Sequence, residues 1–593
     1  MTSSIPRPEH PRPERFRPAW LNLNGEWRFE FDFGDTGMER GLFREPFEGR
    51  PILVPFSPES KLSLIGYTDF IPAMFYRREI VIPEEWQGMR ILLHFGAVDC
   101  ECRVFLDGVD VGSHRGGQTS FELDVTDSVH WGKTQQLTLY VRDDLRSGLH
   151  GCGKQSKKFA SEGCCYTRVT GIWQTVWLEA VAFAGLRDCK IVADLDNGAF
   201  FVTPKFYRME SEYRFEVTAL ADGTIAGVGI GAAADGVPVR IPLTEKREWN
   251  PADPFLYTLE FRVFDAKGTL IDEASGYAGL RKIIWSGNKL YLNNQEIFLR
   301  FVLDQGFYPD GIWTAPDDDS LRRDIELSMQ SGFNGARLHQ KVFESRFHYW
   351  ADKLGYLTWA EFGSWGIDWS KSEARANFLT EWREAVSRDL NHPSIIGWTP
   401  LNESCPTAET AVAAAFPTPE AWENYRSWIT EIYELTKSLD PSRPVNDSSG
   451  YLHVKTDLWT VHAYQENLEL LRSALFPPSG DVMYHIPSRE VKYTGQPYLN
   501  DEFGGFRLET ASAEGDGFGY YGMLITDPAE LCRRIAEQTD WMVESSGLAG
   551  YCYTQLTDVE QERNGIFRYD RSAKVPSGML ADVFGKKPKY SKW

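Results

Sequence analysis

Two glutamates, Glu403 and Glu502, stand where a pair of catalytic carboxylates would be expected. Glu403 ends the segment Ile395-Ile-Gly-Trp-Thr-Pro-Leu-Asn-Glu, and Glu502 ends the segment Pro497-Tyr-Leu-Asn-Asp-Glu, directly before Phe-Gly-Gly. Each carboxylate therefore follows a short apolar run and precedes a chain reversal. Cleavage of a glycosidic bond needs two such groups: one gives a proton to the leaving oxygen, and the other meets the positive charge that develops at the sugar carbon. The pair predicts this chemistry if both glutamates face one cleft.

The C-terminal half of the chain alternates apolar runs with amphipathic helical patterns, which is typical of a parallel α/β sheet. Eight strand candidates in about 300 residues favour a single (β/α)8 barrel, a TIM barrel, over an open doubly wound sheet. The candidates are Phe298–Leu303, Gly335–Leu338, Thr358–Ala360, Ile395–Pro400, Pro444–Asn446, Leu458–Val461, Pro497–Asn500 and Gly550–Thr554.

Polar and titratable side chains follow these predicted strands, at the end of the barrel where active sites lie. Glu403 and Glu502 are 99 residues apart, which three βα units of about 33 residues span, so they belong to strands four and seven on opposite sides of the mouth. Any one such residue could be a structural polar group, but so many polar and titratable residues at one end of the barrel favour a functional site. The set is Asp304, Gln305, Arg337, His339, Glu361, Asn402, Glu403, Asp447, His462, Tyr464, Glu502, Gln555 and Asp558.

The part of the chain before the barrel shows only β patterns. After a proline-rich arm that extends to about Pro18, short alternating strands separated by turns predict a β sandwich or jelly roll in residues 1–184. About 100 further residues of the same texture predict an immunoglobulin-like β-sandwich in residues 185–284. The predicted barrel then takes residues 285–593.

The composition argues against several classes of partner. The 593 residues carry a net charge of −21 with both signs interspersed, whereas nucleic acids and anionic membranes need a basic surface. No apolar run approaches the length of a membrane span, and the start of the chain has no apolar signal segment. Aromatic residues make up 14% of the chain, including 20 Trp, which suits large cores and stacking platforms for sugar rings.

The nine cysteines form an odd set without a Cys-x-x-Cys pair, which points away from a disulfide framework and from a structural zinc site. The cluster from Cys100 to Cys165 could hold a bridge or a metal ion, but buried reduced thiols in a cytoplasmic protein are the favoured interpretation. The full set is Cys100, Cys102, Cys152, Cys164, Cys165, Cys189, Cys405, Cys532 and Cys552.

An ordered set of motifs resembles glycoside hydrolase family 2, the family of β-galactosidases, β-glucuronidases and β-mannosidases. Nearly the whole chain takes part. Arg15–Phe29 and Tyr166–Glu179 look like the first and last strands of the family's sugar-binding jelly roll, and Trp249–Leu259 and Gly279–Ile283 look like its immunoglobulin-like module. Phe333–His339 resembles the second barrel strand, Trp398-Thr-Pro-Leu-Asn-Glu403 the acid/base site, and Glu502-Phe-Gly the nucleophile site.

The resemblance implies roles for several residues. Glu403 would be the acid/base and Glu502 the nucleophile, and Asn402 would bond the 2-hydroxyl of the sugar. Arg337 could hold Glu502 ionised by charge pairing, and Tyr464 could hydrogen-bond it. The remaining candidate substrate-binding residues are Asp304, His339, His462, Gln555 and Asn564.

Departures from the family's motifs bear on metals and on the sugar. The segment after strand three, Glu361-Phe-Gly-Ser-Trp-Gly, lacks the histidine that matches the magnesium site of the family's large β-galactosidases, so we expect no required metal, and no cofactor is implied. The segment Glu562-Arg-Asn-Gly-Ile-Phe-Arg568 lacks the lysine with which β-glucuronidases hold the sugar carboxylate. A uronate stays open, since Arg563 or Lys341 could pair with a carboxylate.

The sequence therefore predicts a retaining exo-glycosidase of β-galactosidase type that acts on a terminal non-reducing sugar. β-Galactofuranosides, α-L-arabinosides and β-hexuronides are alternative substrates for the same mechanism, and a transglycosidase is open as well. A non-catalytic carbohydrate-binding protein is the alternative class, which the presence of both carboxylates disfavours. A homo-oligomer stays open, because a neighbouring subunit could close the cleft.

Overall fold

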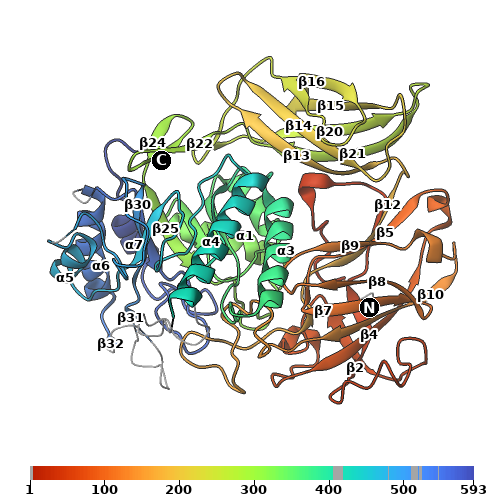
Figure 1. Ribbon diagram of the computed structural model, residues 1–593, viewed down its shortest axis with the longest axis horizontal. Coiled ribbons are helices and arrows are strands. Elements are labelled where there is room, and N and C mark those ends of the chain that lie inside the picture. The colour runs from red at the N-terminus through yellow and green to blue at the C-terminus, as the bar shows by residue number, and fades with distance from the viewer. Residues whose placement is uncertain (1–4, 405–417, 479, 509–518, 520–523, 545–546) are drawn as a thin grey trace.

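The computed structural model describes residues 5–404, 418–478, 480–508, 519, 524–544 and 547–593. Figure 1 shows three units: a β-sandwich that carries the N-terminus, a second β-sandwich above, and an α/β unit beside them that ends the chain. The predicted order of two β domains and one barrel is confirmed. The residues at which we divide them stay predictions.

The first domain packs a four-stranded sheet on a six-stranded sheet around one apolar core. Short 3-10 helices lie before the first strand and in the loops of this domain: η1 (Pro13–Arg15), η2 (Lys61–Ser63), η3 (Glu84–Trp86) and η4 (Thr126–Ser128). In order across the smaller sheet lie β1 (Trp20–Asn22), β12 (Val176–Val181), β5 (Arg90–Phe95) and β9 (Phe121–Asp124). Across the larger sheet lie β3 (Arg50–Val54), β2 (Gly25–Phe31), β4 (Ala73–Val81), β10 (Thr134–Arg142), β7 (Glu101–Leu106) and β8 (Val109–Arg115), and β6 (Val98–Asp99) pairs separately with β11 (Gly171–Ile172).

The second domain is a smaller sandwich with its own core. In β20 (Tyr257–Phe264) the buried Tyr257, Leu259, Phe261 and Val263 alternate with less buried residues, as expected for a strand with one face on a core. One sheet consists of β13 (Leu186–Asp194), β14 (Ala199–Phe206) and β17 (Val239–Pro242), and the other of β16 (Thr224–Ala232), β15 (Arg214–Ala221), β20 and β21 (Leu270–Ala278). Two short pieces, β18 (Trp249–Asn250) and β19 (Asp253–Pro254), pair near its end, and β22 (Ile283–Ser286), β23 (Lys289–Leu292) and β24 (Gln295–Ile297) lead into the α/β unit.

The α/β unit is built on a parallel sheet whose central strands are buried along their whole length, as parallel strands covered on both faces must be. Its helix α1 (Asp318–Gln330) begins at Asp317, whose side chain accepts a hydrogen bond from the backbone N–H of Ser320. The strand order is β28 (Ile395–Thr399), β27 (Leu357–Glu361), β26 (Gly335–Leu338), β25 (Leu299–Asp304), β33 (Gly550–Thr554), β30 (Tyr498–Gly504) and β29 (Trp459–His462). The other elements are α2 (Ser345–Leu354), α3 (Ser372–Asp389), α4 (Pro419–Leu439), α5 (Leu468–Leu475), α6 (Pro528–Glu544), α7 (Ser577–Phe584), β31 (Arg507–Leu508) and β32 (Leu524–Ile525).

The predicted fifth strand, Pro444–Asn446, is wrong as a regular strand. Seven of the eight predicted strands form the sheet, and the fifth position holds one isolated parallel bridge between Val445 and Trp398. Pro444 has no N–H to donate, and the N–H of Val445 donates to Oδ2 of Asp457 at 3.0 Å instead of to a neighbouring strand. The backbone ladder therefore cannot extend at this point, although the chain still runs beside β28.

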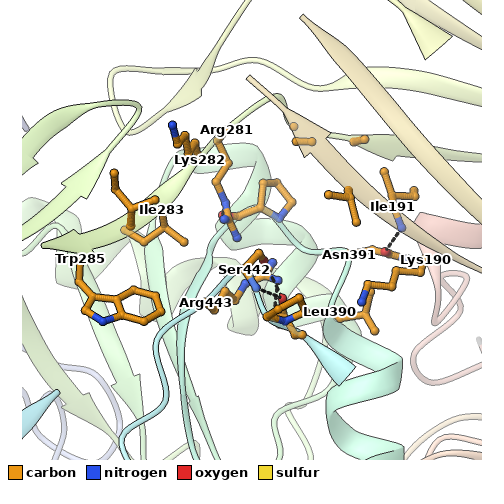
Figure 2. A pocket seen from close by; sticks show the side chains of 18 residues that line it. Lys190, Ile191, Arg281, Lys282, Ile283, Trp285, Leu390, Asn391, Ser442 and Arg443 are labelled. Atoms are coloured by element: carbon orange, nitrogen blue, oxygen red, sulfur yellow. Dashed lines mark hydrogen bonds and ion pairs between the residues drawn. The ribbon is translucent and has the colours of Figure 1, made fainter. Parts of the chain in front are cut away.

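A cavity of about 440 Å³ lies between the second domain and the barrel (Figure 2). Arg281 on its wall donates to the carbonyl oxygens of Pro393, at 2.9 Å, and Ile395, at 2.7 Å. Ile395 begins β28, whereas Glu403 follows the other end of that strand. The cavity is therefore at the end of the barrel opposite to the predicted catalytic residues.

Candidate active site

Glu403 and Glu502 lie on two sides of His462 at the carboxyl ends of the barrel strands. One carboxylate oxygen of each glutamate and one ring nitrogen of His462 all lie within 4.8 Å of one another. Retaining glycosidases hold their two carboxyl groups about 5–5.5 Å apart, whereas inverting enzymes need about 6.5–9.5 Å to admit a water molecule. The spacing here is that of direct attack by one carboxylate.

Glu502 is buried and surrounded by hydrogen-bond donors. Arg337 Nη1 donates to Oε1 at 2.7 Å, Tyr464 donates its hydroxyl to Oε2 at 2.6 Å, and His462 Nε2 lies 3.3 Å from Oε1. Burial raises the pKa of Glu502, but the charges of His462 and Arg337 outweigh it and hold that pKa well below its usual range. Glu502 is therefore kept as a carboxylate, the form that attacks an electrophilic carbon.

Glu403 has a more open setting and an uncommon backbone conformation. Its side chain is 15% exposed, against 5% for Glu502, and its Oε1 lies 2.7 Å from Nδ1 of His462. Its φ is +44°, in the left-handed region, and its N–H donates to the carbonyl of Ser449 at 2.9 Å. Non-glycine residues hold this conformation where the surrounding structure fixes them, which is frequent at functional sites. This backbone turn aims Glu403 at His462 from the end of β28.

His462 links the two carboxylates. Burial lowers its pKa, but the charge of Glu502 and the hydrogen bond to Glu403 outweigh this effect and raise it above the ordinary value. Its Nε2 also lies 2.9 Å from the hydroxyl of Ser449. Glu403, His462 and Glu502 have the donor types that a metal ion needs, yet both imidazole nitrogens already have partners among the described residues, so the absence of a required metal stays our prediction.

Arg337 contacts four other side chains of the site. Besides Glu502, it donates to Oε2 of Glu361 at 2.7 Å and to Oδ1 of Asn402 at 2.6 Å, and its Nη2 lies 3.1 Å from Nδ1 of His339. The contact with Arg337 engages the amide oxygen of Asn402 and not its NH2 group; the predicted bond from that NH2 to a sugar hydroxyl stays a prediction. Burial and the charge of Arg337 lower the pKa of His339 well below its usual range, so its imidazole is neutral.

Replacing Arg337 by methionine is expected to lower kcat by about 100-fold, because one charged donor to the reacting carboxylate is lost. Without Arg337, burial raises the pKa of Glu502, so the acid limb of the kcat/KM profile should move to higher pH. Steady-state rates across pH measure both effects, with the exposed Arg568→Met as the control. An unchanged acid limb would leave Arg337 with a structural role alone.

Three predicted substrate-binding residues lie in hydrogen-bonded networks of their own. Gln555 and Asn564 are fully buried, Gln555 Nε2 donates to Asn564 Oδ1 at 2.7 Å, and Asn564 Nδ2 donates to Oε1 of Glu562 at 3.1 Å. Asp304 accepts from the N–H of Gly306 at 2.9 Å. Among the described residues, no hydrogen bond or ion pair joins these three to Glu403 or Glu502, and their role in substrate binding stays a prediction.

The surroundings of Lys341 do not suit a residue that binds a sugar carboxylate. Its Nζ donates to the carbonyls of Gly306 at 2.6 Å and Trp313 at 2.7 Å, and burial lowers its pKa to about 7. Two backbone acceptors and a weakened positive charge make it a poor partner for a sugar carboxylate. Arg563 is partly exposed, and its backbone carbonyl accepts from Lys574 at 3.1 Å.

Lys154 is a cation of the site that the sequence did not suggest. It comes from the loop between β10 and β11 of the first domain, is 6% exposed, and holds its Nζ 4.1 Å from the centre of the Trp365 ring. Trp365 in turn donates to the backbone carbonyl of Asn402 at 3.2 Å. The charge of Lys154 lowers the pKa of Glu502, so the two groups are neighbours. Within the described ranges no carboxylate lies within 4.0 Å of its Nζ.

Two glycines explain how Lys154 reaches the barrel. A Cβ on Gly151 would stand 2.1 Å from the carbonyl oxygen of Gly363, and one on Gly153 would stand 2.2 Å from that of Gln340. The N–H of Cys152 donates to the carbonyl of Trp365 at 2.7 Å. Only a loop with glycine at both positions can approach the barrel backbone so closely. The pair Gly151 and Gly153, just before Lys154, is the feature of the sequence that could have indicated this close approach.

Three protein-family models match the chain in order. The sugar binding domain of glycosyl hydrolases family 2 matches residues 21–178, a further glycosyl hydrolases family 2 model matches residues 204–281, and the family's TIM barrel domain matches residues 286–504. A Paenibacillus borealis β-glucuronidase is 22% identical over 96% of this chain and 97% of its own length. A Thermoanaerobacter pseudethanolicus β-galactosidase is 22% identical over 90% of this chain and 66% of its own length.

Solved structures share the whole architecture. A β-glucuronidase from Ruminococcus gnavus, in complex with an N1-substituted uronic isofagomine, aligns with a TM-score of 0.77 at 18% identity and covers 98% of this chain and 100% of its own. A Lactobacillus rhamnosus β-glucuronidase aligns with a TM-score of 0.77 at 19% identity and covers 98% of each chain. The three-domain fold is therefore common to these proteins.

Proposed function

The chain belongs to glycoside hydrolase family 2, and on that premise we propose that it removes a terminal sugar from the non-reducing end of a glycoside by double displacement at Glu403 and Glu502. The observation that supports this assignment best is the approach of the two carboxylates, whose oxygens lie within 4.8 Å of one another beside His462. That spacing suits an enzyme that retains the configuration at the anomeric carbon.

The reaction has two steps. Glu502 attacks the anomeric carbon while Glu403 gives its proton to the leaving oxygen, so the glycosidic bond breaks and a glycosyl ester of Glu502 forms. Glu403 then takes a proton from a water molecule, whose oxygen attacks the same carbon and releases Glu502. The greater exposure of Glu403 suits a group that must meet both a leaving group and water.

For the sugar, the position of Lys154 favours β-hexuronides over the neutral β-galactosides that the sequence first suggested. A buried ammonium group beside the nucleophile, with no carboxylate within 4.0 Å in the described part of the chain, can pair with the carboxylate of a uronic acid. The likeness to β-glucuronidases over the whole chain supports the same choice. β-Galactofuranosides and α-L-arabinosides are the remaining alternatives.

A panel of nitrophenyl glycosides tests the substrate: glucuronide, galacturonide, galactopyranoside, galactofuranoside, arabinosides and mannoside. We expect a hexuronide to give the highest kcat/KM. Lys154→Met should lower kcat/KM for hexuronides by about 100-fold, because the substrate carboxylate would be buried without its partner, and neutral sugars should lose far less.

The control for Lys154 is Lys158→Met, since Lys158 is in the same loop with a side chain that is 69% exposed. An equal loss on charged and neutral sugars would contradict a role for Lys154 in charge recognition. Preference for a neutral sugar in the unmodified enzyme would overturn the hexuronide. No hydrolysis of any glycoside would instead favour the non-catalytic alternative.

We also propose that the enzyme works in a reducing compartment, the cytoplasm, because the eight described cysteines are free thiols. Cys405 lies outside the described residues. No helix in the described ranges is long and apolar enough to span a lipid bilayer. A carbohydrate is the proposed partner, and self-association into a homo-oligomer stays a prediction.

A further inference from the structure

Two adjacent cysteines of the first domain lie in a turn that contacts the barrel. Of the eight cysteines that the structure describes, six are buried, and only Cys164 and Cys165 are partly exposed. Both belong to the loop of the first domain that carries Lys154. The N–H of Tyr166, the residue after the pair, donates to the backbone carbonyl of Lys154 at 2.7 Å, which places the pair beside Lys154. The charges of Lys154 and Glu403 also act on the thiol of Cys164.

The cysteines lie in a tight turn that is fastened to the barrel. Glu162 and Cys165 exchange two backbone hydrogen bonds of 2.9 Å each, and Gly163 takes a φ of +54° between them. Gln561, from the segment after β33, donates its Nε2 to the carbonyls of Gly163 at 2.9 Å and Cys165 at 3.0 Å. Because the turn is held on both sides, its backbone has a fixed place on the barrel.

The surroundings of Cys164 favour its thiolate, the reactive form of a cysteine. The hydrogen bond from Cys165 and the charge of Lys154 lower the pKa of Cys164 to about 6, against the opposing effects of burial and of Glu403. The titratable groups that face Cys164 across the cleft edge and from its own loop are Lys154, Cys165, Tyr166, Glu403 and Glu562. Lys154 is the cation among them and stabilises the thiolate, so a Cys164 thiolate and a substrate carboxylate would compete for the charge of Lys154.

We propose that Cys164 is a modification site that exchanges with low-molecular-weight disulfides, and that the resulting adduct blocks the catalytic cleft. The thiolate sulfur of Cys164 attacks one sulfur of the disulfide, forms a mixed disulfide and expels the other half as a thiolate. The small disulfide is the oxidant, and an added thiol reverses the step. The adduct removes the negative charge beside Lys154 and places a bulky group next to Glu403. The block of hydrolysis rests on the proposed function, whereas the modification itself does not.

The test treats the folded enzyme with dithiobis-nitrobenzoate, an aromatic disulfide whose released thiolate is coloured. One thiol should react about tenfold faster than glutathione at about pH 6, since its thiolate is far more abundant although somewhat less nucleophilic. Cys164→Ser should lose this fast phase, and Lys154→Met should slow it. Cys165→Ser and Cys405→Ser should keep it; the latter control is needed because Cys405 follows Glu403 closely in the sequence.

Hydrolysis should fall in step with the fast phase and return when dithiothreitol is added, and Cys164→Ser should be active but insensitive. A fast phase that survives in Cys164→Ser, or that disappears in Cys405→Ser, overturns the site. Complete labelling with unchanged hydrolysis overturns the block. If no glycoside is hydrolysed by the unmodified enzyme, the release of coloured thiolate still decides whether Cys164 is the reactive thiol, so the two proposals fail separately.

Discussion

Replacing Glu502 by glutamine is expected to lower kcat/KM by ~10⁴-fold or more on every glycoside that the enzyme cleaves. Glutamine has nearly the same shape as glutamate, but its amide cannot attack the anomeric carbon or form the glycosyl ester. The loss should be alike for good and poor leaving groups, because both need the same attack. Steady-state hydrolysis of the nitrophenyl panel measures this.

The control for Glu502 is Glu466→Gln, which changes an exposed glutamate in the neighbouring loop after β29. The fold of both variants is checked by thermal unfolding, since Arg337 loses its anionic partner in Glu502→Gln. A mass increase of one sugar on the peptide that contains Glu502, after rapid quenching of the unmodified enzyme, would identify the ester directly. Hydrolysis by Glu502→Gln at a rate near that of the unmodified enzyme would contradict the nucleophile assignment.

Replacing Glu403 by alanine is expected to lower kcat by about 10²–10⁴-fold on substrates with poor leaving groups. On a dinitrophenyl glycoside the loss of the first step should be small, because this leaving group departs without a proton. The ester should then accumulate, since no base activates water. Added azide, which needs no base, should restore turnover and give a glycosyl azide of retained configuration.

The leaving-group series and the azide response together measure the role of Glu403. Tyr464→Phe is a matched comparison, because it removes a hydrogen bond of 2.6 Å to Glu502 and leaves Glu403 in place. That variant should show no azide rescue. A Glu403→Ala enzyme that azide does not rescue, or whose loss is equal for all leaving groups, would count against the acid/base assignment.

The large features of the fold could be predicted because they depend on local pattern. Alternating strands such as Tyr257–Phe264 and largely apolar strands such as Ile395–Thr399 differ in the sequence in the same way as they differ in burial. The spacing of Glu403 and Glu502 fixed their strands, and the structure places both beside His462. Consecutive βα units occupy consecutive positions around a barrel, so the number of units between two residues predicts where each lies. The positions of Glu403 and Glu502 could therefore be predicted without knowledge of any long-range contact.

Other features could not be predicted because they depend on contacts between distant segments. Nothing local shows that Asp457 takes the N–H of Val445 and so interrupts the fifth strand. Gln555 follows the eighth predicted strand and was therefore predicted to lie at the active-site end of the barrel. Its amide instead donates to Asn564 within a buried hydrogen-bond network. Lys154 belongs to another domain, so the pattern of the barrel strands could not predict that it lies at the site.

The docking of residues 152–168 on the barrel has a consequence for how such an enzyme can evolve. The glutamates proposed to break the bond and the lysine proposed to bind the sugar carboxylate are inherited in different domains, and domains change partly independently of one another. If Lys154 recognises the sugar as proposed, substitutions at Lys154 should alter the range of accepted sugars without disturbing the strands that hold the glutamates. A gene that kept only the barrel would lose Lys154 and its contact with Trp365.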